Sequence, residues 1–219
     1  MEKKRLGVLV SGSGSNLQAL LDACAVSDFP AQVALVLSNV PTAFALERAR
    51  KAGVAAEVLE HKSFADRDAF DAELIQRLRG HRVEIVCLAG FMRLLGTRFL
   101  EAFPGRVLNI HPALLPAFPG LHGPRQALKH GVKIAGCTVH FVDAGLDSGP
   151  IIVQAAVPVL PDDDEQKLAA RILTEEHRIY PLAVRWLCEG RLSVHERTVR
   201  IDAEPLTEDH MLRNPGRAR

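Results

Sequence analysis

The sequence predicts an α/β fold built around a mostly parallel β-sheet. Short, continuous runs of apolar residues alternate along the first half of the chain with segments whose apolar residues recur at helical spacing. A continuous apolar run is typical of a strand that is buried on both faces. Strands that alternate with helices of this length form βαβ units with right-handed crossovers.

The first half supplies four strands and three helices in this alternation. The apolar run 6–10 breaks at the Ser/Gly-rich segment 11–16, and a helix follows in which Leu17, Leu20 and Leu21 fall at helical spacing. The other predicted elements are strands over 33–37, 54–59 and 83–88 and helices over 44–51 and 66–79.

The second half is less regular. A long helix runs from Asp162 towards Gly190, and its acidic start suits the positive end of the helix dipole. Pro181 should kink this helix. Its predicted core stripe consists of Leu168, Ile172, Ile179, Leu182 and Trp186. The other predicted elements are strands over 106–110, 135–142 and 150–159 and a short helix over 126–130.

Length and composition indicate a single globular domain. The chain has 219 residues, of which 47% are hydrophobic and 24% charged, and these are ordinary values for a soluble enzyme. We find no internal repeat, linker or low-complexity segment. We therefore expect one domain over 1–203, followed by a polar, mobile tail over 204–219.

Charge, hydropathy and cysteine usage narrow the function classes. A formal net charge of +1 argues against nucleic acid as the main partner, because phosphate-backbone binding usually needs a basic face. No apolar run approaches the roughly 20 residues of a membrane span, and none near the N-terminus suits a signal peptide. The four cysteines lie far apart, and His122, His140 and His177 lack metal-ligand spacing. We assign no metal and no membrane partner, and we expect a cytoplasmic, reducing location.

The segment 11–16, Ser-Gly-Ser-Gly-Ser-Asn, lies between the first strand and the first helix. Its glycines allow a tight turn, and the amides at the helix start favour a phosphate group. Leu17 occupies the third glycine position of a dinucleotide motif, and no Gly-Lys-Ser/Thr is present. A monophosphate is the favoured ligand, although Gly/Ser turns also occur for purely structural reasons.

Asn109 and His111 lie two residues apart at the end of a predicted strand, so both side chains point to the same face. Asp147 follows in a glycine-bounded loop and could orient the imidazole. An amide donor, a titratable ring and a neighbouring acid suit acyl transfer without a covalent intermediate. The alternative is a turn asparagine, a surface histidine and a turn-forming aspartate. A position beyond the carboxyl ends of the strands, where open α/β sheets bind ligands, favours the functional interpretation.

Three further charged residues are candidates for ligand contact. Arg67 and Arg93 are either surface charges or partners of an acidic ligand, because a guanidinium matches a carboxylate in a bidentate manner. Glu176 on the long helix is either an ordinary solvated residue or a substrate contact.

These residues give the chain a close resemblance to the phosphoribosylglycinamide formyltransferases, the folate-dependent enzymes of purine synthesis. The resemblance extends from Leu6 to about Ile201. Together its motifs are highly specific, although none is so alone. They are Ser11-Gly12-x-Gly14-Ser15-Asn16, Leu88-Ala89-Gly90-Phe91-Met92-Arg93, Asn109-Ile110-His111-Pro112, Leu114-Leu115-Pro116, Gly120-Leu121-His122, Gly136-x-Thr138-Val139-His140-Phe141-Val142 and Leu146-Asp147-x-Gly149-Pro150.

The resemblance implies a Rossmann-like twisted sheet with helices on both faces. The half over 1–104 would bind the ribonucleotide, and the half over 105–203 would bind folate and carry the chemistry. The residues implied for the ribonucleotide are Gly14, Ser15 and Asn16, and the candidate Glu176 is assigned to the same substrate. Those implied for the formyl donor, 10-formyltetrahydrofolate, are Arg67, Met92, Arg93, Leu94, Leu95 and Asn109. The chain departs from the family pattern at Ala144-Gly145 and at Gly123-Pro124. Both departures concern the shape of the loops around the folate, so they bear on folate affinity more than on the chemistry.

The implied reaction is formyl transfer from the folate nitrogen to the amine of glycinamide ribonucleotide. Asn109 and protonated His111 would donate hydrogen bonds to the developing oxyanion. Asp147 would favour the charged imidazole and could relay the amine proton through water. The partners are these two small molecules, and the protein is expected to be a monomer or a homodimer.

Other enzyme classes remain open from the sequence. A formyltetrahydrofolate hydrolase uses the same chemistry but would carry an N-terminal regulatory domain. A methionyl-tRNA formyltransferase would need a further C-terminal RNA-binding domain. A nicotinamide-dependent oxidoreductase is weakened by the missing third glycine. A non-catalytic phosphate-sensing module is the simplest alternative.

Overall fold

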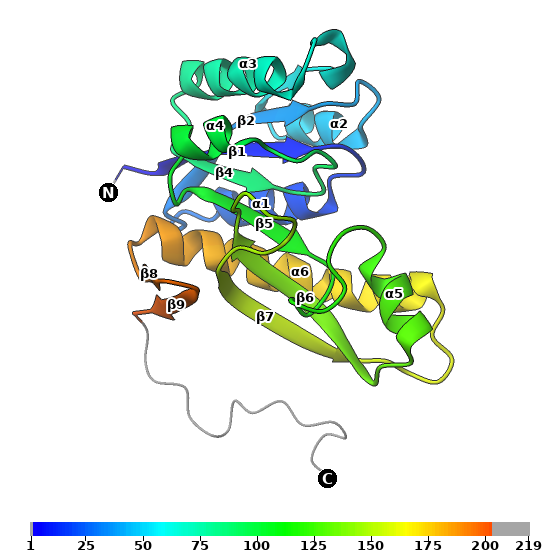
Figure 1. Cartoon of the computed structure of the whole chain (residues 1–219). Coiled ribbons are helices and arrows are strands. Elements are labelled where there is room, and N and C mark those ends of the chain that lie inside the picture. The colour runs from blue at the N-terminus through cyan, green and yellow to red at the C-terminus, as the bar shows by residue number, and fades with distance from the viewer. Residues whose placement is uncertain (1, 203–219) are drawn as a thin grey trace.

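The computed structural model describes residues 2–202, and in this range one nine-stranded sheet runs through the molecule in the order β3-β2-β1-β4-β5-β6-β7-β9-β8 (Figure 1). The predicted tail over 204–219 lies outside the described residues. The strands are β1 (Lys4–Val10), β2 (Ala31–Ser38), β3 (Ala55–Val58), β4 (Ile85–Leu88), β5 (Val107–His111), β6 (Ile134–Phe141), β7 (Ile151–Pro158), β8 (Leu192–His195) and β9 (Thr198–Ile201).

The strand pairing in the sheet changes from parallel to antiparallel at β5. From β3 to β5 every neighbouring pair is parallel, whereas β5, β6 and β7 pair antiparallel. Beyond them β9 pairs parallel with β7, and β8 closes the edge antiparallel to β9. The predicted mostly parallel α/β fold is confirmed, and β5 joins the βαβ half to the antiparallel half.

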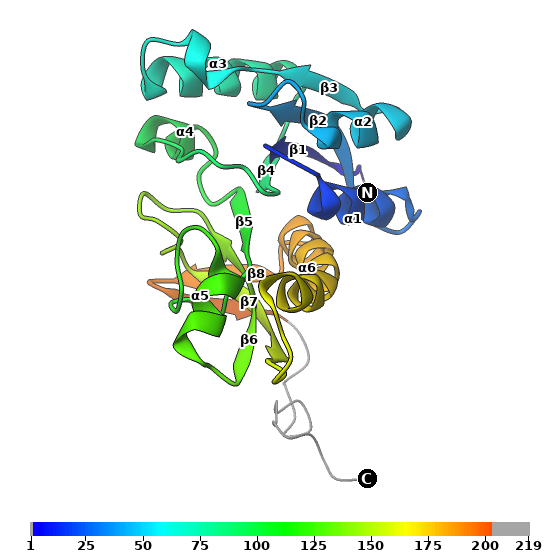
Figure 2. The same ribbon diagram turned by 90° about the vertical axis from the view of Figure 1, so that its right-hand side faces the viewer.

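Helices cover both faces of the sheet (Figure 2). Helices α1, α2 and α6 pack on one face, where Leu17 and Ile172 share a core with Val8 of β1. Helices α3 and α4 pack on the other, where Phe70 and Phe99 share a second core with Leu9. Alternation along β1 feeds both cores. The helices are α1 (Ser15–Ala25), α2 (Phe44–Lys51), the 3₁₀ turn η1 (His61–Ser63), α3 (Arg67–Gly80), α4 (Thr97–Ala102), α5 (Gly123–His130) and α6 (Glu165–Cys188).

The buried face of the long helix α6 differs from the predicted one. It continues through Pro181, but Leu182 is 38% exposed and Trp186 is only partly buried. Tyr180 takes the core position instead, because its ring is fully buried and its hydroxyl donates to the carbonyl oxygens of Leu88 and Leu108. A tyrosine can occupy a core when its polar end is satisfied in this way.

Four elements have no counterpart in the predicted set: the 3₁₀ turn η1, the short α4 and the hairpin strands β8 and β9. All are three to six residues long and too short for a periodic pattern. Within residues 2–202 no helix is long and apolar enough to span a membrane.

Candidate active site

The candidate residues gather at the carboxyl-terminal edge of the parallel strands. Ser11 follows β1, Gly90 follows β4, and Asn109 and His111 end β5. The first two ends are tied together, because the Ser11 amide donates to the Gly90 carbonyl at 3.1 Å and the Met92 amide donates to the Ser11 hydroxyl at 2.9 Å. Open α/β sheets bind ligands at this edge.

Asn109, His111 and Asp147 come together in the structure. The Nδ1 atom of His111 lies 3.4 Å from Oδ2 of Asp147, and Nδ2 of Asn109 lies 3.4 Å from Oδ1 of the same carboxylate. Alternation along β5 puts both side chains on one face, as expected. The His111 and Asp147 side chains are only 5% and 12% exposed, so water screens their contact little.

The second ring nitrogen of His111 is fixed by backbone. Its Nε2 atom lies 2.9 Å from the carbonyl oxygen of Phe118, which can only accept, so Nε2 carries a hydrogen. A second proton on Nδ1 would face the Asp147 carboxylate. Each nitrogen of the His111 ring therefore faces an oxygen acceptor.

The Asp147 carboxylate is also held by the loop between β5 and α5. The Gly120 amide donates to its Oδ2 atom at 2.8 Å. Asp147 itself has a left-handed backbone with φ of 49°, a strained conformation often found at functional sites. The next residue, Ser148, is anchored through its carbonyl oxygen, which accepts from Arg197 in the β8–β9 turn at 2.7 Å.

His140 also belongs to the cluster, and the sequence did not indicate that it would lie there. It pairs with Asn109 across β5 and β6. Its Nδ1 donates to the Phe141 carbonyl at 2.8 Å, so Nε2 accepts from Asn109 Nδ2 at 3.2 Å. Burial lowers the pKa of His140 and keeps the ring neutral. An antiparallel pairing of 106–110 with 135–142 would have revealed this neighbour.

The predicted phosphate loop begins α1. Gly14 has a left-handed φ of 72°, and a Cβ there would lie 2.6 Å from Cβ of Ala45, so no larger residue fits. Helix geometry leaves the first amides of α1, including those of Ser15 and Asn16, without intrahelical acceptors. An anion at this turn would receive these donors.

Asn16 and Glu176 meet beside this loop. Asn16 Nδ2 donates to Glu176 Oε2 at 2.6 Å, while Asn16 Oδ1 is buried without a partner. Glu176 is only 6% exposed on the core side of α6, so it is not a solvated residue. Burial raises the pKa of its carboxyl group, although the Asn16 hydrogen bond opposes the shift.

The predicted folate residues divide into three environments. Arg67, Arg93 and Leu94 line one cavity of about 190 Å³. Met92 is 62% exposed next to them in sequence, whereas Leu95 is buried in the core with α3 and α4 and does not line the cavity. The remaining lining residues are His61, Phe64, Asp66 and Phe70.

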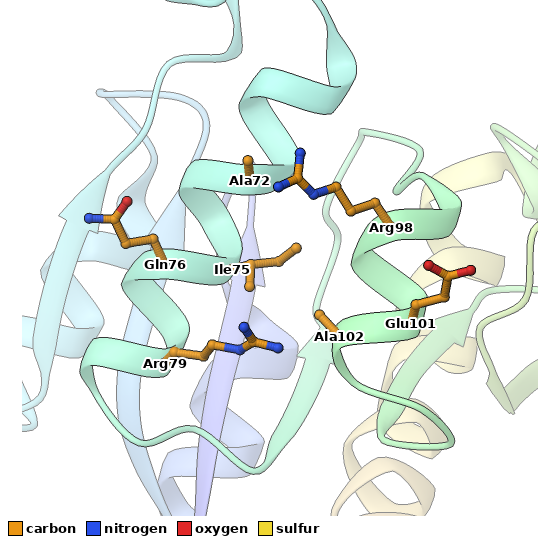
Figure 3. A pocket seen from close by; sticks show the side chains of 7 residues that line it. All are labelled: Ala72, Ile75, Gln76, Arg79, Arg98, Glu101 and Ala102. Carbon is orange, nitrogen blue, oxygen red and sulfur yellow. The ribbon is translucent and has the colours of Figure 1, made fainter.

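A larger cavity of about 510 Å³ lies between α3 and α4 (Figure 3). Ala72, Ile75 and Arg79 approach it from α3, and Arg98 and Ala102 from α4. None of the predicted site residues lines it. The candidate active site is therefore chosen by the convergence of titratable groups at the sheet edge and not by cavity size.

Comparisons with known proteins agree with this geometry. The formyl transferase family model matches residues 4–184. The phosphoribosylglycinamide formyltransferase of Escherichia coli K12 is 49% identical over 199 residues, covering 91% of this chain and 94% of the relative. The trifunctional purine biosynthetic protein adenosine-3 of Drosophila melanogaster is 53% identical over 190 residues, but these are 86% of this chain and only 14% of the relative.

A solved structure gives the same result. The crystal structure of glycinamide ribonucleotide transformylase 1 from Symbiobacterium toebii has 59% sequence identity and a TM-score of 0.90. The match covers 91% of this chain and 94% of that one. By family model, by sequence and by structure, the chain belongs to the formyl transferase family.

Proposed function

We propose that this enzyme transfers the formyl group of 10-formyltetrahydrofolate to the amine of glycinamide ribonucleotide, a step of de novo purine biosynthesis. The relatives that match 91% of this chain and are themselves covered to 94% carry the corresponding name. The observation that carries the proposal is the contact of Asn109 and His111 with one Asp147 carboxylate. The relatives do not support a nicotinamide-dependent oxidoreductase.

The β5 cluster would act on the formyl carbon. The neutral amine attacks that carbon, the carbonyl electrons move to oxygen, and the bond to the folate nitrogen then breaks. Asn109 and His111 would stabilise the oxyanion, and a good donor in such a place contributes about 3–4 kcal/mol. The Asp147 carboxylate would accept the amine proton through water and return it to the leaving nitrogen, giving a general acid–base contribution of about 10²–10⁴.

The donors of the cluster are engaged before substrate arrives. Both hydrogens of Asn109 Nδ2 face acceptors, His140 Nε2 at 3.2 Å and Asp147 Oδ1 at 3.4 Å. The longer contact is the weaker one. The formyl oxygen would therefore replace Asp147 as the second acceptor of Asn109, leaving His140 to hold the amide in place.

The other two groups would bind the substrates. Gly14, Ser15 and Asn16 would hold the ribonucleotide phosphate at the start of α1, with Glu176 beside Asn16. The cavity of Arg67, Arg93 and Leu94 would take the formyl donor. Its two guanidinium groups and two phenylalanine rings suit a ligand with carboxylates and an aromatic ring system. Met92 and Leu95 would contribute as its neighbours in sequence.

The halves of the domain would divide the work at β5, with 1–104 binding the ribonucleotide and 105–203 supplying folate contacts and chemistry. Because Arg67 and Arg93 lie in the first half, the donor would be held by both. We further propose that the enzyme works in the cytoplasm as a monomer or homodimer, needs no metal and has only these small-molecule partners. Within residues 2–202 no group of metal-ligating side chains is assembled.

The test is product formation. Purified enzyme is mixed with glycinamide ribonucleotide and 10-formyltetrahydrofolate in the presence of a chelator, and the formylated ribonucleotide is followed by mass spectrometry. We expect product that requires both substrates. Release of formate without formylated product would instead indicate a hydrolase.

A further inference from the structure

Asp71 on α3 is a carboxyl group in an unusual place. Its side chain is fully buried, in a turn of α3 whose neighbours Phe70 and Leu74 belong to the core. Its Oδ2 atom accepts a hydrogen bond from the Gly96 amide at 2.6 Å, while its Oδ1 atom is buried without a partner. Burial raises the pKa of this carboxyl group, and the Gly96 amide and the charge of Arg67 oppose the shift.

Stability does not explain this residue. A buried carboxyl group with one oxygen unpaired destabilises the fold, and apolar residues of similar volume are often equal or better at such positions. The single strong contact that Asp71 makes is with backbone at the end of another segment. The function of the residue is therefore to be sought in what that contact holds.

The contact holds the 91–96 segment, which runs from β4 to α4 and carries Met92, Arg93 and Leu94. Gly96 ends this segment and precedes α4. The Arg67 Nε atom lies 3.4 Å from the point that a Cβ of Gly96 would occupy. Asp71 thus contacts the end of the segment whose Arg93 and Leu94 line the 190 Å³ cavity, and the charge of Arg67, another lining residue, acts on its carboxyl group.

Gly96 shows how close this approach is. Its φ of −82° is available to any residue, so backbone conformation does not demand glycine there. A Cβ at Gly96 would instead lie 2.9 Å from Oδ2 of Asp71. The missing side chain lets the carboxylate reach the amide. The contact is therefore built from both sides, by a buried acid on α3 and a glycine on the facing segment.

The contact also fixes the spacing of two helices. Helices α3 and α4 lie side by side, and Ile75 of α3 and Ala102 of α4 line the cavity between them (Figure 3). Because the Asp71 to Gly96 hydrogen bond lies at the start of α4, it sets where the 91–96 segment leaves the cavity.

We infer that Asp71 is a positioning residue for the formyl-donor site, acting through the Gly96 amide to hold the 91–96 segment against Arg67. This inference rests on the proposed function, in which that cavity binds 10-formyltetrahydrofolate. Asp71 does not touch the donor. It sets the distance between the two arginines that do.

The experiment measures kcat and both KM values in the full chain. Asp71→Leu removes the acceptor, Asp71→Asn keeps a weaker neutral one, and Gly96→Ala pushes the two groups apart. We expect the KM for 10-formyltetrahydrofolate to rise about tenfold in Asp71→Leu and Gly96→Ala and less in Asp71→Asn. The KM for the ribonucleotide should stay within about twofold of wild type.

The split between the two KM values separates positioning from mere loss of folded protein, because a smaller active fraction lowers the apparent kcat and leaves both KM values unchanged. Glu101→Gln, an exposed acid on the facing helix α4, and Gly80→Ala, where a Cβ has free space, are the matched controls. If Asp71→Leu does not fold, Asp71→Asn and Gly96→Ala decide.

A wild-type donor KM in the folded Asp71 and Gly96 variants, or an equal rise of both KM values, would overturn the inference. Calorimetric titration of the same proteins with 10-formyltetrahydrofolate separates this result from failure of the proposed function. Donor binding that the variants weaken, without turnover by the wild type, would sink the proposed reaction and leave the role of Asp71 standing. A wild type that does not bind the donor would overturn both.

Discussion

His111 and Asp147 face each other across 3.4 Å, and each also contacts a backbone group, the ring through the Phe118 carbonyl and the carboxylate through the Gly120 amide. Both anchors come from the loop between β5 and α5. The loop is itself fixed by buried Thr138, whose hydroxyl donates to the Ala113 carbonyl at 2.7 Å. The relationship between the two proposed catalytic groups is thus set before any substrate binds.

His111→Ala should lower kcat by about two orders of magnitude while ribonucleotide binding survives. The substitution removes the ring that faces Asp147 and the hydrogen-bond donor proposed for the oxyanion. Steady-state kinetics with a parallel calorimetric titration would check this. Turnover close to wild type would contradict the role given to the ring.

His140→Leu should lower kcat about tenfold and leave the ribonucleotide KM unchanged, because the Asn109 amide loses the acceptor that orients it. His140 also gives a pH signature. Its pKa is lowered in the folded protein, so the unfolded chain binds more protons below about pH 6.5. Wild-type stability should therefore fall as the pH drops through this value, and denaturant titrations should show a smaller fall in the variant.

Glu176→Gln should raise the free energy of unfolding at pH 7 and weaken ribonucleotide binding. The folded carboxyl has a raised pKa, so the native state binds more protons than the unfolded chain above about pH 4.5. Wild-type stability therefore falls as the pH rises through that window, and the neutral amide avoids the loss. Unfolding curves at pH 4.5 and pH 7 would test this. A difference in free energy of unfolding between variant and wild type that does not grow with pH would contradict the prediction.

Gly14→Val should abolish ribonucleotide binding and spare the formyl donor. Its Cβ would collide with Ala45, and the left-handed φ adds strain. Gly53→Ala is the matched control, because Gly53 has a φ of 69° but nothing within 4 Å of a new Cβ. Calorimetry with each ligand separates the effects, and unchanged nucleotide affinity in Gly14→Val would remove the phosphate-loop assignment.

Arg197→Ala should lower kcat about threefold to tenfold with little change in either KM, because the turn that carries Asp147 loses its anchor at Ser148. Arg200→Ala is the control, since Arg200 is an exposed arginine of the same hairpin. Arg197→Lys should recover part of the loss. Equal rates for the two alanine variants would show that the hairpin does not support catalysis.

The sequence was sufficient for those parts of the molecule in which local patterns determine structure. The helix over 44–51 has the predicted ends, and Asn109 and His111 share a face because strand alternation requires it. Contacts between segments that are far apart in the chain could not be predicted from these local patterns. His140 reaches Asn109 only through antiparallel pairing of β5 with β6, and Asp71 reaches Gly96 only because α3 packs beside α4. The predicted core position of Leu182 is wrong. Its hydrophobicity favours burial, but Tyr180 is buried instead, with its hydroxyl bonded to two carbonyl oxygens.

The most direct test follows a carbon-13 label from the formyl donor in the wild type and in Asp147→Asn, using NMR. We expect the label to appear on the ribonucleotide amine with wild-type enzyme, and product formation about two orders of magnitude slower with the variant. Label released as formate by the wild type, or formylated product at the wild-type rate from Asp147→Asn, would contradict the account.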